Sequence, residues 1–200
     1  MADINSIAGI APAGVLPSEA RTSAAPCEDA REDAPFLDLI ELLFFAYRDF
    51  VGDPDKILAP IGFGRAHHRI IHFVNRHPGM RVADLLDILQ ITKQSLGRVL
   101  RELVQEGFVE SRAGESDRRQ RLLYPTAKAE QLARDFVGIQ NNRIARALEA
   151  CGPDSRETVR LFLLNMIDPE ARETVERLIQ RADRVRLART AQDDPARPGK

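Results

Sequence analysis

The chain has 200 residues, of which 44% are hydrophobic and 30% charged, a composition typical of a globular protein long enough to bury a core. Its 29 Lys and Arg and 30 Asp and Glu residues nearly cancel. The two cysteines, Cys27 and Cys151, exclude a disulfide framework, and the lack of Trp argues against an aromatic platform for single strands or sugars. The most apolar stretch, residues 37–50, is short and interrupted by charges, and no apolar signal segment follows the start. We therefore expect a cytoplasmic protein without a membrane partner.

The charge is unevenly distributed along the chain. Residues 1–60 carry a net charge of −7, residues 61–128 carry +5 and residues 129–200 carry +1. A basic central segment between acidic or neutral flanks is typical of a protein that binds nucleic acid with one part of its surface. Ordinary variation in surface charge is the alternative interpretation, so the charge pattern needs support from motifs.

Both ends of the chain lack the periodic apolar pattern of a folded element. Residues 1–34 contain three prolines and an acidic cluster, and residues 190–200 contain two further prolines. We expect residues 1–34 to form a disordered arm and residues 190–200 a disordered tail.

The first predicted helix spans about residues 35–51 and is apolar on nearly all sides. Its apolar residues recur at the helical spacing of three and four in two interleaved sets. These are Leu37, Ile40, Leu43, Phe44 and Tyr47 in one set, and Leu39, Leu42, Phe45 and Phe50 in the other. We expect Asp53 and Pro54 to end this helix. Since such a helix is buried on two sides, residues 35–60 are predicted to form an N-terminal dimerisation helix and linker.

Residues 61–126 show the pattern helix, short helix, tight turn, helix and β-hairpin. The predicted helices cover residues 65–75, 82–89 and 92–106, and the predicted strands cover residues 108–111 and 121–124. Thr92 is expected to cap the third helix. This order predicts a winged helix-turn-helix domain with a two-stranded β wing, followed by further helices.

Side chains that suit DNA gather on the third helix of this domain and at the tip of the hairpin. Gln and Arg make bidentate contacts with adenine and guanine edges in the major groove, and Lys and Ser suit phosphates. The tip has three arginines within four positions, which suits a narrow, negative minor groove. The candidate DNA-binding residues are Thr92, Lys93, Gln94, Ser95, Arg98, Arg101, Arg118, Arg119 and Arg121.

The chain resembles the MarR family of transcription regulators over about residues 35–150. The resemblance rests on residues 77–85, 91–96 and 117–122, the last of which matches the family's Asp-x-Arg wing signature. It implies that Arg119 enters the minor groove and that Asp117 holds the wing by pairing with a nearby Arg. It also implies a homodimer formed by the terminal helices. Such a dimer reads an inverted repeat in double-stranded DNA.

With the resemblance, the fold class is mainly α: a winged helix-turn-helix with a two-stranded β wing, an N-terminal dimerisation helix, and C-terminal dimerisation helices within residues 127–189. Residues 64–69 and 91–96 are most similar to the proteobacterial PetP-type branch of the family. Gln94 and Gly97 stand where many members carry Ser or Thr, so the base preference of other members does not transfer.

The four histidines of the chain, His67, His68, His72 and His77, lie close together in the sequence. His68 and His72 share a helix face at a spacing that can ligate a metal, and the alternative is that the histidines serve packing and capping. Effectors of the family are small anionic or phenolic compounds that bind between the dimer helices and the DNA-binding domain. By that resemblance, Arg65, His67, His68 and His72 are the candidate effector-pocket residues.

No motif of the chain predicts catalysis, a cofactor or a metal site. Redox sensing by Cys27 or Cys151 would need a lowered thiol pKa, which neither sequence context provides. Residues 62–64, Gly-Phe-Gly, lack the preceding strand of a dinucleotide loop. The expected function is therefore an effector-responsive, sequence-specific DNA-binding regulator and not an enzyme. The alternative is a winged-helix module for protein interaction or metal sensing that does not read DNA sequence.

Overall fold

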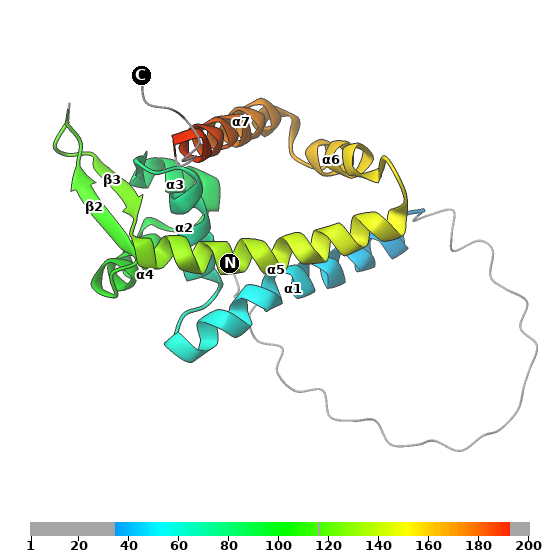
Figure 1. Cartoon of the computed structure of the whole chain (residues 1–200), viewed down its shortest axis with the longest axis horizontal. Helices are drawn as coiled ribbons and strands as arrows, with labels where there is room; N and C mark the ends of the chain where they lie inside the picture. Colours follow the sequence, from blue (N-terminus) through cyan, green and yellow to red (C-terminus); the bar gives the residue numbers. More distant parts are fainter. Residues whose placement is uncertain (1–34, 116, 193–200) are drawn as a thin grey trace, which may run out of the picture. The chain divides into compact units, whose positions relative to one another are not determined.

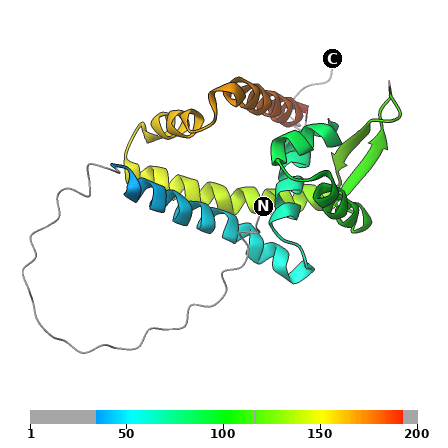
Figure 2. The same cartoon turned by 180° about the vertical axis from the view of Figure 1, so that it is seen from behind.

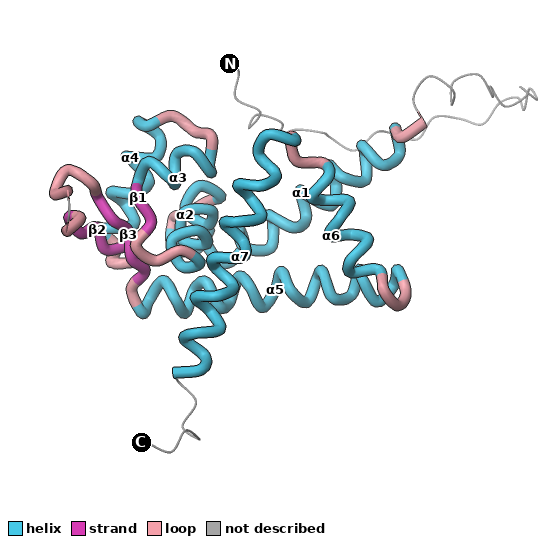
Figure 3. The backbone as a smooth tube through the Cα atoms, turned by 90° about the horizontal axis from the view of Figure 1, so that it is seen from above, coloured by secondary structure: helices cyan, strands magenta, loops and turns pink. Residues whose placement is uncertain are grey.

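The structure is a computed structural model that describes residues 35–115 and 117–192. Helices make up most of the described chain (Figure 3). In chain order the elements are α1 (Leu37–Leu58), a 3₁₀ turn (Ala59–Ile61), α2 (Arg65–Arg76), β1 (Met80–Arg81), α3 (Val82–Leu89), α4 (Lys93–Gln105), β2 (Val109–Ala113), β3 (Arg121–Pro125), α5 (Ala127–Cys151), α6 (Ser155–Asn165) and α7 (Pro169–Gln192). From Glu41 on, the described residues form one compact unit.

The predicted arm and most of the predicted tail lie outside the described residues. These are residues 1–34 at the start and residues 193–200 at the end. α7 continues to Gln192 and so extends past residue 190, where the sequence predicts the tail to begin.

α2, α3, α4 and a small sheet form the winged helix-turn-helix that the sequence predicts (Figures 1 and 2). The sheet has the order β1-β3-β2, and both pairs are antiparallel. β1 is a third strand that the prediction of a two-stranded wing missed. Its Met80 pairs with Leu123, and the N–H of Gly79 donates to the Leu123 carbonyl at 2.7 Å. Two residues give no alternating pattern, so periodicity could not reveal this strand.

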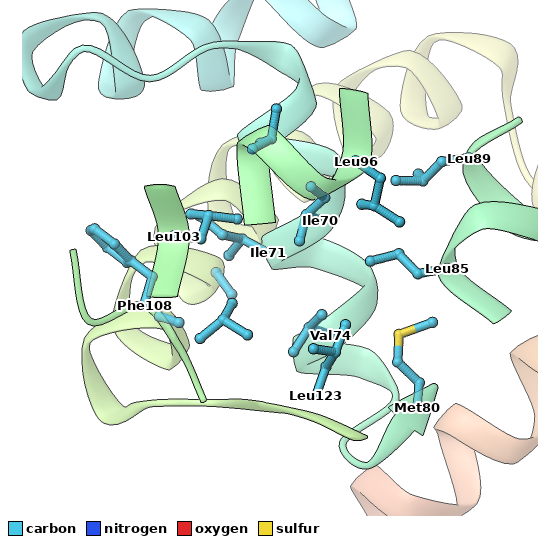
Figure 4. Packing of buried hydrophobic residues seen from close by; sticks show 14 of the residues in the cluster. Ile70, Ile71, Val74, Met80, Leu85, Leu89, Leu96, Leu103, Phe108 and Leu123 are labelled. Carbon is cyan, nitrogen blue, oxygen red and sulfur yellow. The ribbon is translucent and has the colours of Figure 1, made fainter. Parts of the chain in front are cut away.

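The hydrophobic core lies between these helices, the sheet and the first half of α5 (Figure 4). Each of its central side chains is at most 3% exposed. They include Ile70, Ile71 and Val74 of α2, Leu85 and Leu89 of α3, Leu96 and Leu103 of α4, Leu123 of β3 and Phe136 of α5. Because burial of one such side chain contributes about 1.5–3 kcal/mol, this cluster fixes the position of α4 against its neighbours.

The turn between α3 and α4 is set by local hydrogen bonds. The hydroxyl oxygen of Thr92 accepts the N–H of Ser95 at 3.1 Å, which confirms the predicted cap of α4. Gln90 ends α3 in the left-handed region, with φ of 51°. From α2, Arg69 Nη2 donates to the carbonyl of Leu89 at 3.0 Å and so satisfies an acceptor in the last turn of α3.

α1 does not end at Asp53 and Pro54, as the sequence predicts, but continues to Leu58. Val51, Pro54 and Leu58 are buried at helical spacing, so the apolar face runs through the proline. The packing of this face outweighs the cost of a proline inside a helix, which is about 3 kcal/mol. Asp53 is held in the helix by an ion pair with Arg143 of α5, whose Nη2 donates at 2.7 Å.

Thr126 connects the end of α4 to the start of α5. Its hydroxyl donates to the carbonyl of Gly107 at 2.7 Å and accepts the N–H of Ala129 at 3.3 Å. Its own N–H donates to the carbonyl of Phe108 at 3.1 Å. One residue therefore caps α5 and binds Gly107 and Phe108, which lie shortly after the end of α4.

From Glu41 on, α1 runs alongside α5 (Figures 1 and 2). Outside the winged-helix core, the helices leave large apolar side chains 37–70% exposed. We call these side chains the apolar helix surface: Leu42, Leu43, Phe44, Phe45 and Tyr47 of α1, Ile139 and Ile144 of α5, Leu161, Phe162 and Leu163 of α6, Met166 at its C-cap, and Ile179 and Leu187 of α7. Exposed apolar patches of this kind are typical of protein–protein interfaces.

Candidate nucleic-acid interface

α4 presents a polar face on the side opposite to the core. Leu96, Val99 and Leu103 are buried at helical spacing, so the positions between them face solvent. All predicted DNA-binding residues of this element are exposed: Thr92, Lys93, Gln94, Ser95, Arg98 and Arg101. The face offers cationic groups for phosphates together with an amide and guanidinium groups for base edges.

The tip of the wing places Arg118 and Arg119 in solvent. Among the residues that the structure describes, neither guanidinium has a hydrogen-bond or ion-pair partner. Both groups are therefore available to contact phosphates or a narrow minor groove.

Arg121 and Asp117 shape the wing. Arg121 Nε donates to the hydroxyl of Ser111 at 3.1 Å and its Nη2 donates to the Ser111 carbonyl at 3.1 Å, so this predicted DNA contact also ties β3 to β2. The expected pairing of Asp117 with an Arg side chain is absent from the described residues. Its Oδ1 instead accepts the backbone N–H of Arg119 at 2.9 Å. An Asp side chain readily accepts the backbone N–H two residues further along the chain, and this local turn takes the place of the expected pairing with an Arg side chain.

Gly114 closes the tip by backbone contacts. Its N–H donates to the carbonyl of Gln120 at 3.0 Å, and the N–H of Gln120 donates to the carbonyl of Asp117 at 3.0 Å. A Cβ at position 114 would lie 2.8 Å from the Asp117 carbonyl oxygen. Position 114 therefore requires glycine, because only glycine allows the backbone to close the tip that carries Arg118 and Arg119.

Three of the four predicted effector-pocket residues line one cavity of about 210 Å³, formed by α1, α2 and α5. Its lining includes Arg65, His68 and His72 of α2, Tyr47 and Phe50 of α1, and Gln140 of α5. The fourth predicted residue, His67, does not line it.

One buried polar atom at this cavity lacks a partner. His68 is 7% exposed, and within the described residues its Nε2 has no hydrogen-bond partner. Arg65 Nε donates to Oδ2 of Asp55 at 2.9 Å; Asp55 itself does not line the cavity, and its Oδ1 is also buried and unpaired within the described residues. A buried polar group without a partner costs about 1–3 kcal/mol, so a polar ligand in the cavity that pairs with His68 Nε2 would be favoured.

His67 faces α4 and not the cavity that the other three candidates line. Its Nε2 lies 2.8 Å from Oε2 of Glu102. The ring stacks on Phe63, with centroids 4.2 Å apart, and its Nδ1 accepts the N–H of Gly64 at 3.1 Å. These contacts at the first turn of α2 turn the ring away from the neighbouring His68.

Residues 61–120 match the MarR family. The chain is also 48% identical over 139 residues to the HTH-type transcriptional regulator PetP of Rhodobacter capsulatus, covering 70% of this chain and 84% of that protein. This chain belongs to the MarR family. It is a helix-turn-helix transcription regulator of that family, and the predicted resemblance, including the PetP-type branch, is confirmed.

Solved structures of MarR-family proteins share the fold of this chain. FabT of Streptococcus pneumoniae in complex with DNA has a TM-score of 0.59 at 16% identity, covering 66% of this chain and 94% of FabT. A mutant MarR of E. coli complexed with operator DNA has a TM-score of 0.53 at 18% identity, covering 70% of this chain and 99% of that one. At these identities the likeness establishes the winged-helix architecture of this MarR-family chain.

The metal and redox interpretations concern His68 and His72 of α2 and the two cysteines. In the described part of the chain, no three His, Cys, Asp or Glu side chains gather as a metal site. The rings of His68 and His72 lie 6.4 Å apart, and these two histidines are too few for a structural metal site. Cys151 is exposed, and Cys27 lies outside the described residues.

No described helix is long and apolar enough to cross a membrane.

Burial lowers the pKa of three histidines within and just after α2. Desolvation, together with the charges of His68 and Arg76, lowers the pKa of His72 from 6.5 to about 4. The pKa of His68 and that of His77 also lie below 6.5, chiefly because of burial. These histidines are therefore neutral at pH 7 in the folded chain.

Acidification is expected to destabilise this MarR-family fold. The unfolded chain binds a proton at His72 near pH 6.5, whereas the folded chain resists protonation until about pH 4, so stability falls as the pH drops through this window. Between pH 7 and pH 5 the shift of His72 alone corresponds to a loss of up to about 2 kcal/mol. Urea unfolding at several pH values measures this loss. His72→Gln, which cannot titrate, is expected to flatten the dependence, and an equally steep fall in that variant would contradict the assignment.

Sequence reasoning missed the contacts whose partners are distant in the chain. Arg69 braces α3, Gln140 is buried at the cavity, and Glu102 faces His67. Only Gln140 carried a signal, because a Gln follows Phe136 at helical spacing on the buried side of α5.

Proposed function

We propose that this chain acts as a homodimer that binds an inverted repeat in double-stranded DNA. The observation that carries the proposal is the exposed face of α4, with Lys93, Gln94 and Arg98, beside a wing tip that presents Arg118 and Arg119. Such a helix enters the major groove, and arginines of the wing suit the adjacent minor groove. The partners are DNA and a second copy of the chain. Catalysis, a cofactor and a membrane have no part in this function, which is exercised in the cytoplasm.

The apolar helix surface supports the dimer. On α1, five large apolar side chains between positions 42 and 47 are 43–70% exposed. α6 and its C-cap residue Met166 add four more within residues 161–166. A second copy presents the same surface, and a two-fold contact buries both. The same axis places the two α4 helices in successive major grooves, about 34 Å apart.

The cavity between α1, α2 and α5 supports regulation by a small organic anion or a phenol. Arg65 and the unpaired Nε2 of His68 offer polar contacts, and Tyr47 and Phe50 offer apolar ones. α2 belongs to the DNA-binding part, whereas α1 and α5 belong to the proposed dimer part. A ligand bound between them therefore favours one arrangement of the two α4 helices over another.

The experiment that tests DNA reading is selection of bound sequences from a random duplex pool with the purified full chain at near-physiological salt. The expected result is an inverted repeat with half-site centres about 10 base pairs apart. Affinity for that repeat should fall steeply with salt, because each phosphate contact releases counterions. Recovery of no repeat would overturn the proposal and leave a winged-helix module that binds protein or metal.

Arg119→Gln is expected to weaken operator binding about tenfold and to change the base preference within the operator little. The loss of affinity should be larger for operators with A·T-rich flanks, where the minor groove is narrow. The logarithm of the affinity falls linearly with the logarithm of the salt concentration, and we call the steepness of this fall the salt slope. It should decrease by about two per dimer, since each subunit loses one cationic contact. Fluorescence anisotropy titrations at four salt concentrations measure both effects.

Arg112→Gln is the matched control on the same wing. Arg112 is already paired with Glu110, at 2.6 Å, and lies over the ring of Tyr124, so its loss should leave the slope nearly unchanged. Gln94→Ala should instead relax base preference and keep the slope. Equal behaviour of the Arg119 and Gln94 variants would refute this division between wing and helix.

A further inference from the structure

A line of polar contacts leads from the buried first turn of α2 to the exposed face of α4. His67 Nε2 lies 2.8 Å from Oε2 of Glu102, and Oε1 of the same carboxylate accepts Nη1 of Arg98 at 3.2 Å. His67 is 8% exposed, whereas the side chain of Arg98 is 66% exposed. One carboxylate thus joins an interior ring to a guanidinium on the proposed DNA-reading face.

The ring of His67 is held from three sides. Phe63 stacks on it with nearly parallel planes, 3° apart, and Phe63 in turn packs edge-on against Phe108, with centroids 5.3 Å apart. The N–H of Gly64 donates to Nδ1 at 3.1 Å and caps α2 through the ring. The ring therefore has one orientation, and Nε2 has one direction in which to form a hydrogen bond.

The proton of the neutral ring is assigned by the same contacts. A nitrogen that accepts an N–H cannot itself carry a hydrogen, so Nδ1 is bare and Nε2 holds the proton. Nε2–H then donates to the Glu102 carboxylate, a charge-assisted hydrogen bond. The donor that positions Glu102 is thus fixed by the fold of α2.

We propose that His67 is a positioning residue for DNA reading: through Glu102 it holds the Arg98 guanidinium in place on α4. The Arg98 contact with Glu102 uses one of five guanidinium N–H donors and leaves the remainder for a base edge. A guanidinium held in this way loses less conformational freedom when it binds, and its direction selects one base position. This inference rests on the proposed binding of DNA by α4.

Two substitutions of His67 separate this role from its structural one. In His67→Asn, the amide oxygen takes the place of Nδ1 and can still accept the Gly64 N–H, but the shorter side chain has no donor that reaches the Glu102 carboxylate. In His67→Gln, the longer amide places a donor near the position of Nε2, but the acceptor for Gly64 is lost. Asn therefore keeps the cap and Gln keeps the contact with the carboxylate.

The readout is discrimination between the selected operator and duplexes with one base pair changed, measured by competition binding. Arg98→Ala first identifies the base pair whose discrimination falls, by at least about fivefold for a lost bidentate contact. At that base pair we expect His67→Asn to lose most of the same discrimination and His67→Gln to retain it. This order is expected whichever of the two variants has the lower melting temperature, so it separates positioning from stability. Glu102→Gln should resemble His67→Asn, because a neutral amide holds the guanidinium weakly.

Results that contradict the positioning role of His67 differ from those that contradict DNA binding. Retained discrimination in His67→Asn, or equal loss in His67→Asn and His67→Gln, would overturn the positioning role while leaving DNA binding intact. A wild-type protein that recovers no operator would remove the proposed function and this inference with it. Independently of DNA, ¹⁵N NMR of the wild-type chain should show the Nε2–H tautomer at His67, and the Nδ1–H tautomer would overturn the inference.

Discussion

Leu43→Asp is expected to convert the dimer into a monomer and to lower operator affinity by at least about 100-fold. Leu43 lies in the apolar helix surface and is 43% exposed in the single chain. In the proposed dimer this side chain is covered by the partner, and a buried carboxylate without a counter-charge is strongly unfavourable. Each monomer would then hold one half-site alone and lose the advantage of two linked contacts. Sedimentation and fluorescence anisotropy measure the two effects.

Val104→Asp is the matched control for oligomeric state. Val104 is an apolar residue of similar exposure, 40%, but it lies on α4 and outside the apolar helix surface. The same charge at this position should leave the dimer intact. A Leu43→Asp monomer that kept full operator affinity would show that one winged-helix domain suffices for binding, and a Leu43→Asp dimer would place the interface elsewhere.

Phe136→Ala is expected to lower the free energy of unfolding by about 3–5 kcal/mol. Phe136 is 1% exposed and carries α5 into the core of the winged-helix part. Its ring meets the ring of His68 edge-on, with centroids 4.8 Å apart, so truncation leaves a void beside the cavity. Urea unfolding at fixed protein concentration measures the loss, since dimer formation makes stability depend on concentration.

Val104→Ala serves as the control for this truncation, because its side chain is 40% exposed and should cost no more than about 0.5 kcal/mol. If Phe136→Ala costs less than about 1 kcal/mol, the ring does not contribute to the packing of α5 against α2. In that case α5 would be joined to the DNA-binding part mainly through Thr126.

The recognition helix could be predicted from sequence because local signals decide it. Leu96, Val99 and Leu103 repeat at the helical period, and Thr92 is a capping residue at the correct position. Both signals depend on residues within one helix. The exposed face follows directly from the buried one, which is why every candidate DNA contact on α4 proved to be exposed.

Features decided by distant partners could not be predicted in this way. Pro54 indicates a helix end, yet α1 continues because its apolar face packs on other elements. Asp117 was expected to pair with a charged side chain and binds a backbone N–H instead. His67 and Glu102 are 35 positions apart, and no periodicity relates them. The shape of the domain could thus be predicted, while the polar contacts that direct individual side chains required the structure.

Thr126 has a consequence for the length of the operator. In the proposed dimer each α4 lies about 17 Å from the two-fold axis, half of the distance between successive major grooves. α5 then acts as a lever arm whose polar joint to α4 includes the Thr126 contacts with Gly107 and Phe108 and the hydrogen bond that Lys128 Nζ donates to the Glu106 carbonyl at 2.9 Å. The 13-residue α4 is about 18 Å long, so a rotation of about 5° at this joint displaces its first residue, Lys93, by about 1.5 Å, enough to break hydrogen bonds to bases. The tolerance of the protein for altered spacing between half-sites therefore measures the angular stiffness of a joint built around one threonine.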